Sequence, residues 1–310
     1  MATTTTLAQI RTACYNTIKQ PEDCAAYPYA LLDIFINKAH RNIFGGTVTD
    51  PTTERSLVKN SLPFADRTSF LTTLAPIYTS ATATVGASSL SVGTTDSYPS
   101  TGAIWIDGNI ITYTGKTSTS FTGIPASGDG SISFAWASGS QIFALYSLPT
   151  DYLQTISLDY QTSTNAQMIR MVGVDYRDVR NQQLNQQLYQ FTQVDQMPGE
   201  KYFTIVHGQY LLPFIGVTGY AMRLEYVQSP TRLINSTDIS SIPDDYILST
   251  VPYLATGEML LNRGESQEGL NLFKFGYMNV RDMYRFYNTT TKDLIYNQRM
   301  RTSQDGSLNI

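Results

Sequence analysis

A complete set of helix signals lies in residues 241–265, directly after a segment with strand-like alternation. Pro243 suits the first helical position, where its missing N–H is not needed, and Asp244 and Asp245 place negative charge at the positive end of the helix dipole. Apolar residues then recur at spacings of three and four, which predicts one buried face: Ile247, Leu248, Val251, Leu254, Ala255, Met259 and Leu260. Because Gly264 suits a left-handed stop, we expect one long amphipathic helix that the rest of the fold must cover.

Further helices are predicted near both ends of the chain. One covers residues 7–20, and the next covers residues 28–43 and is closed by Gly45 and Gly46. Apolar residues occupy more than one face of this second helix, so we expect it to be buried on two sides. A last helix is predicted over residues 267–287.

The composition changes at Pro76, after which Ser, Thr, Gly and Ala dominate. The charged residues between there and Leu148 are Asp96, Asp107, Lys116 and Asp129. The pair Asp107-Gly108 is typical of a tight turn and predicts a β-hairpin. We therefore expect residues 77–147 to form an inserted β-barrel or sandwich.

Alternation of period two continues after Pro149 and predicts an antiparallel meander with turns at His207-Gly208 and at residues 216–219. Residues 181–196 fit either an amphipathic helix or a long loop. The expected fold class is α+β, in which a bundle of the N- and C-terminal helices carries an antiparallel sheet region and a small inserted all-β domain. The predicted domains are a discontinuous core of residues 1–76 and 148–287, the insertion 77–147, and a partner-docking tail, 288–310.

Composition favours a protein whose surface is covered by other proteins. Charged residues make up 15% of the chain, below the roughly 25% of ordinary soluble domains, and there are 21 tyrosines. Few charges then have to be desolvated when a partner binds. A secreted all-β protein remains an alternative. Against it, Cys14 and Cys24 fit reduced, buried thiols, and no signal peptide or membrane span is recognisable. These features favour a protein of the cytoplasm.

The sequence favours neither catalysis nor strong nucleic-acid binding. The net charge of −4 gives no basic footprint, although contact with DNA that slides past stays allowed. The histidines, His40 and His207, have no recognisable catalytic neighbours, and His40 is expected at the boundary of the core. Asp107 and Asp129 fit turns better than a metal site, and no phosphate loop or dinucleotide fingerprint is present, so we expect no enzyme, cofactor or metal.

Aromatic residues of the insertion offer a possible glycan site. Trp105, Tyr113 and Trp136, if exposed, could stack on a sugar ring. The alternative, which we favour, is that these rings form the core of a module that has few large aliphatic residues.

The C-terminal quarter of the chain is locally basic. Two acidic residues, Asp282 and Asp293, face a larger basic set between residues 270 and 301: Lys274, Arg281, Arg285, Lys292, Arg299 and Arg301. Such a run is usually a solvated helix face. Because residues 288–310 are polar and have little to anchor them, we expect this set to dock on a neighbouring subunit or an acidic partner.

Several phrases together resemble the head-to-tail adaptor (connector, or neck) proteins of tailed bacteriophages. They are LAQIRTACYNTIKQ, LLDIFINKAHRNIF, LPTDYLQTISLDY, YFTIVHGQYLLPFI, AMRLEYVQSPTRLI and SIPDDYILSTVPYLATGEMLLNRGE, in that order between residues 7 and 265. Residues 83–124 resemble a small β module that recurs as an insertion in phage structural proteins. The simplest adaptors lack this module.

The resemblance implies a virion protein of the neck, assembled in the cytoplasm of the host bacterium, without a membrane partner. It implies a homo-oligomeric ring, commonly of twelve copies, that binds the portal and a tail or nozzle protein, and through which double-stranded DNA passes without sequence-specific binding. In such a protein the C-terminal helix and tail dock on the portal, and the ring helps to retain the genome. A glycan-binding phage tail protein is the second interpretation, and a hydrolase is a distant third.

Overall fold

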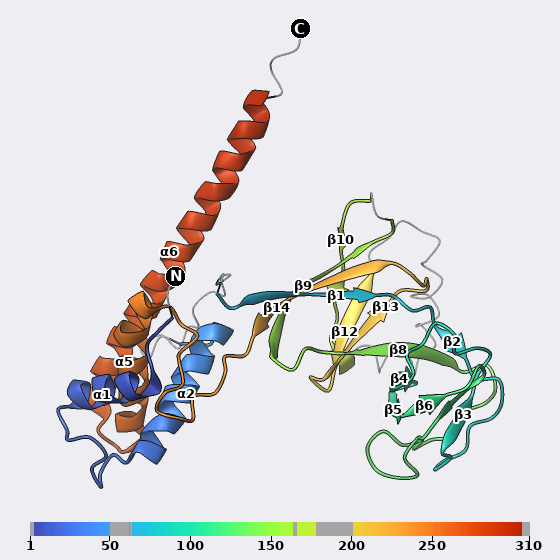
Figure 1. Ribbon diagram of the computed structural model, residues 1–310, viewed down its shortest axis with the longest axis horizontal. Helices are drawn as coiled ribbons and strands as arrows, with labels where there is room; N and C mark the ends of the chain where they lie inside the picture. Colours follow the sequence, from blue (N-terminus) through green and yellow to red (C-terminus); the bar gives the residue numbers. More distant parts are fainter. Residues whose placement is uncertain (1–2, 50–61, 63, 164–165, 178–200, 306–310) are drawn as a thin grey trace. The chain divides into compact units, whose positions relative to one another are not determined.

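The computed structural model describes residues 3–49, 62, 64–163, 166–177 and 201–305, with side chains up to Tyr287 in the last range. The chain divides into two compact units (Figure 1). The helical unit comprises Met1–Arg67, Asp151–Gln154 and Val227–Ile310, and the sheet unit comprises Thr68–Thr150 and Thr155–Tyr226. The segment 181–196, which fits a helix or a loop, lies outside the described residues.

The predicted helices are confirmed and form the helical unit: α1 (Leu7–Ile18), α2 (Tyr29–Gly45), α5 (Asp244–Asn262) and α6 (Ser266–Asp305). A capping box starts α1, in which Thr6 and Gln9 each bond the other's backbone N–H. Pro243 is the N-cap of α5, and Pro252 lies inside that helix. The last helix does not end at Tyr287 as predicted but continues to Asp305, so residues 288–305 of the predicted tail are helical.

Asp244 fastens the N-terminus of the chain to the start of α5. Its carboxylate accepts the backbone N–H groups of Thr4 and Thr5 at 2.9 Å and both threonine hydroxyls at 2.7 Å. These bonds lower the pKa of Asp244. The sequence suggested only that Asp244 interacts with the helix dipole. In the structure it also anchors the N-terminal residues Thr4 and Thr5.

Glycines bring α5 and α6 into close contact. A Cβ added at Gly257 would lie 2.5 Å from the backbone nitrogen of Phe273, and one added at Gly276 would lie 2.9 Å from the backbone nitrogen of Leu254. The two helices therefore approach at the level of their backbones. Around them the core of the helical unit includes Leu7, Leu32, Ile36, Val251, Leu254, Val280 and Met283.

The expectation that α2 is buried on two sides holds only in part. Leu32, Ile36 and Ile43 are buried in the core of the helical unit. Ile34, Lys38 and Arg41, at spacings of four and three, form one exposed stripe on this helix. The stripe leaves charged side chains available to solvent or to a partner.

The described strands of the chain form three sheets. One has the order β1-β14-β9-β10, the largest has the order β11-β12-β13-β8-β4-β5 with β2 also paired to β8, and the smallest has the order β3-β7-β6. Their bounds are β1 (Asp66–Thr72), β2 (Ile77–Tyr78), β3 (Ser89–Ser91), β4 (Gly102–Ile106), β5 (Asn109–Tyr113), β6 (Gly115–Lys116), β7 (Ser120–Thr122), β8 (Gln141–Ser147), β9 (Tyr152–Gln161), β10 (Ile169–Arg170), β11 (Val172–Gly173), β12 (Tyr202–Val206), β13 (Tyr210–Phe214) and β14 (Ala221–Gln228).

Two of the predicted turns are confirmed as tight hairpin turns. Asp107 and Gly108 adopt φ angles of 45° and 85° between β4 and β5. His207 and Gly208 adopt φ angles of 51° and 67° between β12 and β13. Two successive residues at positive φ match the right-handed twist of a hairpin, which explains why these pairs carried a reliable signal.

The expected fold class is wrong, because the chain is not a helical bundle that carries a small inserted β domain. Fourteen strands in three sheets stand beside four helices in the described part of the chain, so the sheets are more than a small inserted domain. Strand β8, which the sequence assigned to the insertion, pairs with β4 on one side and with β13 on the other. The segment is thus part of one larger sheet.

The burial of β8 gives the physical reason for this continuity. Ile142 and Ala144 pack into the core that contains Leu90 and Phe121, whereas Phe143 and Leu145 pack on the opposite face of the sheet. A strand that is buried on both faces belongs in the interior of a sheet. The domain limits predicted at residues 76, 147 and 287 stay predictions.

Candidate docking surfaces of the helical unit

The predicted basic residues lie on α6. Lys274 and Arg285 are exposed and Arg281 is half-buried. The Asp282 carboxylate lies 3.7 Å from Arg281 and 3.6 Å from Arg285, and exposed ion pairs of this length contribute little stability. The side chains of Lys292, Arg299 and Arg301 lie outside the described residues. The docking role of this set stays a prediction.

An exposed aromatic surface runs beside these basic residues. On α6, Phe275 is 49% exposed and Phe286 is 50% exposed. Each packs on a tyrosine of α5: Phe275 lies 4.7 Å from Tyr253 and Phe286 lies 6.4 Å from Tyr246, between ring centroids. We call these four rings the α5–α6 face. Exposed apolar patches of this kind mark contact sites for other proteins.

The three aromatic residues of the possible glycan site are not exposed. Trp105 is 0%, Tyr113 2% and Trp136 7% accessible. Trp105 packs on Phe143 on one face of the large sheet, whereas Tyr113 and Trp136 belong to the core on its other face. The rings therefore offer no common stacking surface, and the favoured interpretation, a role in the core, fits their burial.

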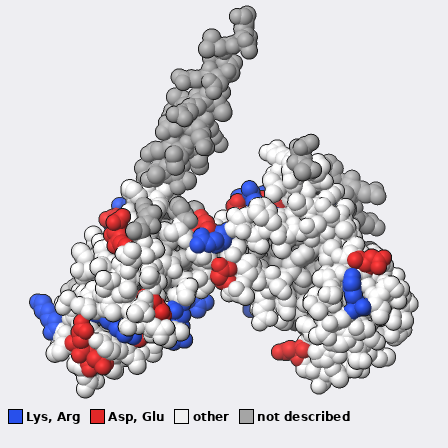
Figure 2. All heavy atoms as spheres, in the orientation of Figure 1, with Lys and Arg blue, Asp and Glu red and all other residues white. Residues whose placement is uncertain are grey.

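Uncharged surface dominates the face of the molecule that Figure 2 shows, where white side chains far outnumber blue and red ones. This agrees with the charged fraction of 15%. The charges that are present gather in small groups, and one of these groups borders a pocket on the helical unit.

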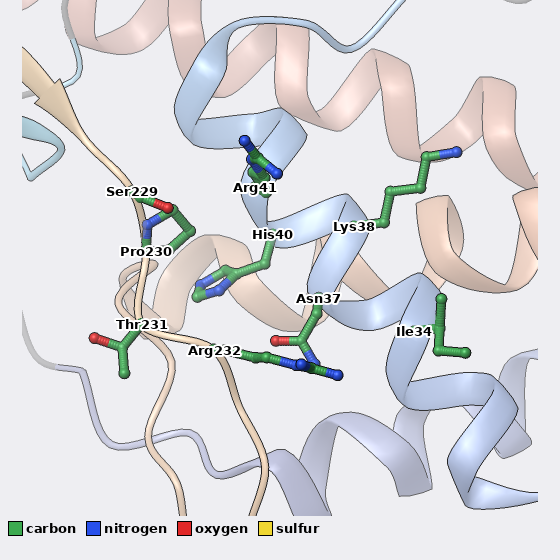
Figure 3. Close-up of a pocket in the computed structure, with 9 residues that line it drawn as sticks. All are labelled: Ile34, Asn37, Lys38, His40, Arg41, Ser229, Pro230, Thr231 and Arg232. Atoms are coloured by element: carbon green, nitrogen blue, oxygen red, sulfur yellow. The ribbon is translucent and has the colours of Figure 1, made fainter. Parts of the chain in front are cut away.

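The pocket lies between α2 and the segment that follows β14 (Figure 3), and has a volume of about 380 Å³. Ile34, Asn37, Lys38, His40 and Arg41 of α2 line one wall. Residues 229–232 form the facing wall. Figure 3 shows the His40 ring projecting from α2 toward this segment, with Arg41 and Arg232 coming from different walls.

Asn37 holds the two walls together. Its side-chain oxygen accepts the backbone N–H of Leu233 at 2.8 Å, and its amide donates to the backbone carbonyls of Leu233 and Asp33 at 2.9 Å. A second bond, from the N–H of Ser229 to the carbonyl of Asp151 at 2.5 Å, fixes the other end of the segment. Hydrogen bonds within the helical unit therefore hold both ends of this segment in place.

His40 is buried, at 1% exposure, and not at the boundary of the core as expected. Its Nε2 lies 3.0 Å from Ser240 Oγ, which itself accepts the N–H of Ile242 at 3.0 Å. The Ser240 hydroxyl and the Nε2 atom of His40 therefore share one hydrogen bond. Among the described residues Nδ1 has no partner.

Burial also lowers the pKa of His40 to about 4, so the ring is neutral near pH 7. Lys38 forms an ion pair with Glu258 of α5. Arg41 and Arg232 are exposed, and in the described part of the chain neither contacts a carboxylate. The pocket therefore combines a net positive rim with a buried neutral imidazole.

No local motif predicted this pocket. His40, Arg41 and Arg232 do not form a local motif, since the arginines are separated by most of the chain. Only the folded chain brings the 229–232 segment to α2.

Two further classes of site are absent from the described residues. No three His, Cys, Asp or Glu side chains gather there as a metal site requires. None of the helices described has the length and apolar character that crossing a membrane demands.

The curated proteins contain no match to this chain. Residues 131–256 match a family model described as SU10 adaptor protein. The matched stretch includes β8 and β14 and reaches Thr256 of α5, whereas α1, α2 and α6 lie outside it. Over residues 131–256 the chain is thus similar to an adaptor of the phage head-tail type, which confirms the resemblance in this coarser form.

Proposed function

We propose that this protein is a structural component of a phage virion, a head-to-tail adaptor that joins other virion proteins and catalyses no reaction. The match of residues 131–256 to the adaptor family carries the proposal. Two properties of the chain support it: the low content of charged residues and the exposed aromatic rings of the α5–α6 face. Both suit a protein that other proteins cover.

We infer that the protein assembles into a closed ring between portal and tail, commonly of twelve copies as the resemblance implies. A ring of identical subunits needs two different complementary faces on each copy. The α5–α6 face is one candidate for such a contact. A net charge of −4 would keep DNA in the channel from being held tightly, because affinity for DNA depends on neutralising many phosphates.

We assign portal docking to the C-terminal part of α6 and the residues that follow it. Lys274 and Arg285 are exposed on the described part of this helix and suit an acidic partner. The remaining basic residues, Lys292, Arg299 and Arg301, continue the same run in the sequence. The tail or nozzle protein would bind elsewhere on the ring, so that the adaptor bridges the two.

Electron microscopy of the purified protein, alone and mixed with its portal, tests this assignment. We expect rings, and we expect a variant without residues 288–310 to form rings that no longer attach to the portal. Normal attachment by the truncated protein would reject the docking role of this segment. Persistent monomers in the presence of the portal would argue against the adaptor function itself.

Substitutions on the α5–α6 face test its part in self-association. Phe275→Ser should weaken ring formation, measured by analytical ultracentrifugation. Leu248→Ser is the matched control, because Leu248 is an apolar residue of the same unit with similar exposure, 44%, outside this face. An equal effect of both substitutions would show that the face has no special role.

A further inference from the structure

We propose that strand β1 pairs with β1 of a second copy of this chain, antiparallel and across a two-fold axis at Phe70. The contact extends the sheet β1-β14-β9-β10 into the second copy. A two-fold contact joins subunits in pairs and does not by itself build a ring. It is therefore separate from the ring contact proposed above, and it does not require the protein to be a phage adaptor.

One edge of β1 is free in the described chain. The strand covers Asp66–Thr72, and its neighbour in the sheet is β14. No described strand pairs with its other edge. An edge strand of this length presents a row of unpaired N–H and C=O groups, to which a further strand can bind.

Two backbone bonds at the ends of β1 show which residues face this free edge. The Gln228 N–H donates to the Ala65 carbonyl at 2.8 Å, and the Thr73 N–H donates to the Tyr220 carbonyl at 2.9 Å. Backbone groups alternate in direction along a strand, so the odd-numbered residues between these bonds face β14. The N–H and C=O groups of the even-numbered residues therefore face the free edge.

Three of these even-numbered residues also have exposed side chains. They are Thr68, Phe70 and Thr72, and Phe70, at 73%, is the most exposed large apolar side chain of the described residues. Soluble proteins commonly protect a free edge with charged side chains, proline or a bulge. Residues 68–72 contain no charged residue, proline or glycine. This part of the edge is thus open to the addition of a strand.

The sequence of the strand favours a second copy as the partner, because threonines lie at equal distances on both sides of Phe70. With two copies antiparallel and Phe70 opposite Phe70, Thr68 of each copy lies opposite Thr72 of the other. Aromatic pairs and threonine pairs that lie directly opposite each other stabilise antiparallel strands. The charged Arg67 lies away from the axis in this arrangement and does not meet Arg67 of the second copy.

Other registers and the other edge of the sheet fit less well. The smallest shift that keeps the backbone bonds moves one copy by two residues, and in either direction it places Phe70 opposite a threonine. The aromatic pair is then lost. At the opposite edge of the sheet, β10 is only two residues long, Ile169–Arg170, and offers few backbone groups.

Cysteines introduced on β1 of the full chain test the direction and the register of this pairing. We expect disulfide-linked dimers when the Thr68→Cys and Thr72→Cys variants are mixed and oxidised, because Cα atoms of directly opposite residues lie about 5.5 Å apart, which a disulfide spans. Either variant alone should give no such dimers, since its two cysteines would lie at opposite ends of the paired segment. Cys14 and Cys24 are present in every sample and give a common background on the non-reducing gel.

Two outcomes of this experiment would overturn the proposal. The first is the absence of dimers above the background in the mixture. The second is an equal yield from either variant alone, which would indicate parallel strands or random collisions. Because the gel counts cross-linked pairs, it is independent of ring formation, and rings without these cross-links would refute the β1 contact and leave the adaptor function standing.

Substitution of Phe70 tests the centre of the contact. Phe70→Lys places two positive charges directly opposite each other and should weaken the pairing about tenfold or more in sedimentation experiments. Phe134→Lys is the matched control, because Phe134 is a large apolar residue of the sheet unit with similar exposure, 64%, and lies outside β1. Mixing the Phe70→Lys and Phe70→Glu variants should restore the pairing. Equal weakening by the two lysine variants, or no restoration in the mixture, would overturn the proposal.

Discussion

The close approach of α5 and α6 predicts that Gly257→Ala destabilises the helical unit. The new Cβ would lie 2.5 Å from the backbone nitrogen of Phe273 and 2.8 Å from its Cα, whereas ordinary contacts begin at 3.4 Å. Both obstacles are backbone atoms, so no side-chain rotation relieves them. The helices would have to separate locally by about 0.9 Å, the difference between 3.4 and 2.5 Å.

The expected cost follows from two opposing effects. Overpacking of this kind costs about 1–3 kcal/mol, and the backbone contacts place this site at the upper end. Alanine in place of glycine in a helix recovers about 1 kcal/mol. We therefore expect a net loss of about 2 kcal/mol in the free energy of unfolding, which corresponds to roughly 30-fold faster exchange of the protected amides of α5 and α6.

Gly45→Ala at the end of α2 is the matched control. A Cβ at this position would lie 3.5 Å from the nearest side-chain atom, in Leu153, which is an ordinary contact. This variant should be neutral or more stable by up to about 1 kcal/mol. Hydrogen exchange measured by mass spectrometry on both variants gives the comparison. The reasoning is refuted if Gly257→Ala protects α5 and α6 as well as Gly45→Ala does.

Three further predictions concern the helical unit. Burial lowers the pKa of His40 to about 4, whereas the unfolded ring binds a proton near pH 6.5, so the free energy of unfolding should fall by about 2 kcal/mol from pH 7 to pH 5. Urea unfolding of His40→Gln should show a flatter dependence on pH. An equal slope in the variant would contradict this. Asp244→Asn should speed amide exchange at Thr4, whose N–H the carboxylate accepts at 2.9 Å, and unchanged exchange would count against the role of Asp244 as an anchor. A double-mutant cycle on Arg11 and Asp33 should give a coupling of about 1 kcal/mol, and a value near zero would show that this bidentate pair is energetically unimportant.

Local signals predicted the helices and the tight turns well. Helix α5 was readable because Asp244, Gly264 and the apolar spacing between them are all set by neighbouring residues. The same holds for the Asp107-Gly108 turn, where backbone conformation depends on the pair itself. These features need no knowledge of the distant chain.

Long-range pairing could not be read in the same way. The drop in charge after Pro76 suggested a separate insertion, yet β8 completes a sheet with β13, far along the chain. The change in composition at Pro76 indicates that the following residues can be buried. It does not indicate which strands pair with one another. For the same reason the pocket was not predicted, since Arg41 and Arg232 come to line one pocket only in the folded chain, where Asn37 is hydrogen-bonded to Leu233.

An electron-microscopy map of the phage particle tests the proposed function most directly. We expect density for this chain as a closed ring at the junction of portal and tail, with DNA on its axis and the C-terminal part of α6 against the portal. Density for the chain at any other position in the particle, or its absence from the particle, would contradict the adaptor function.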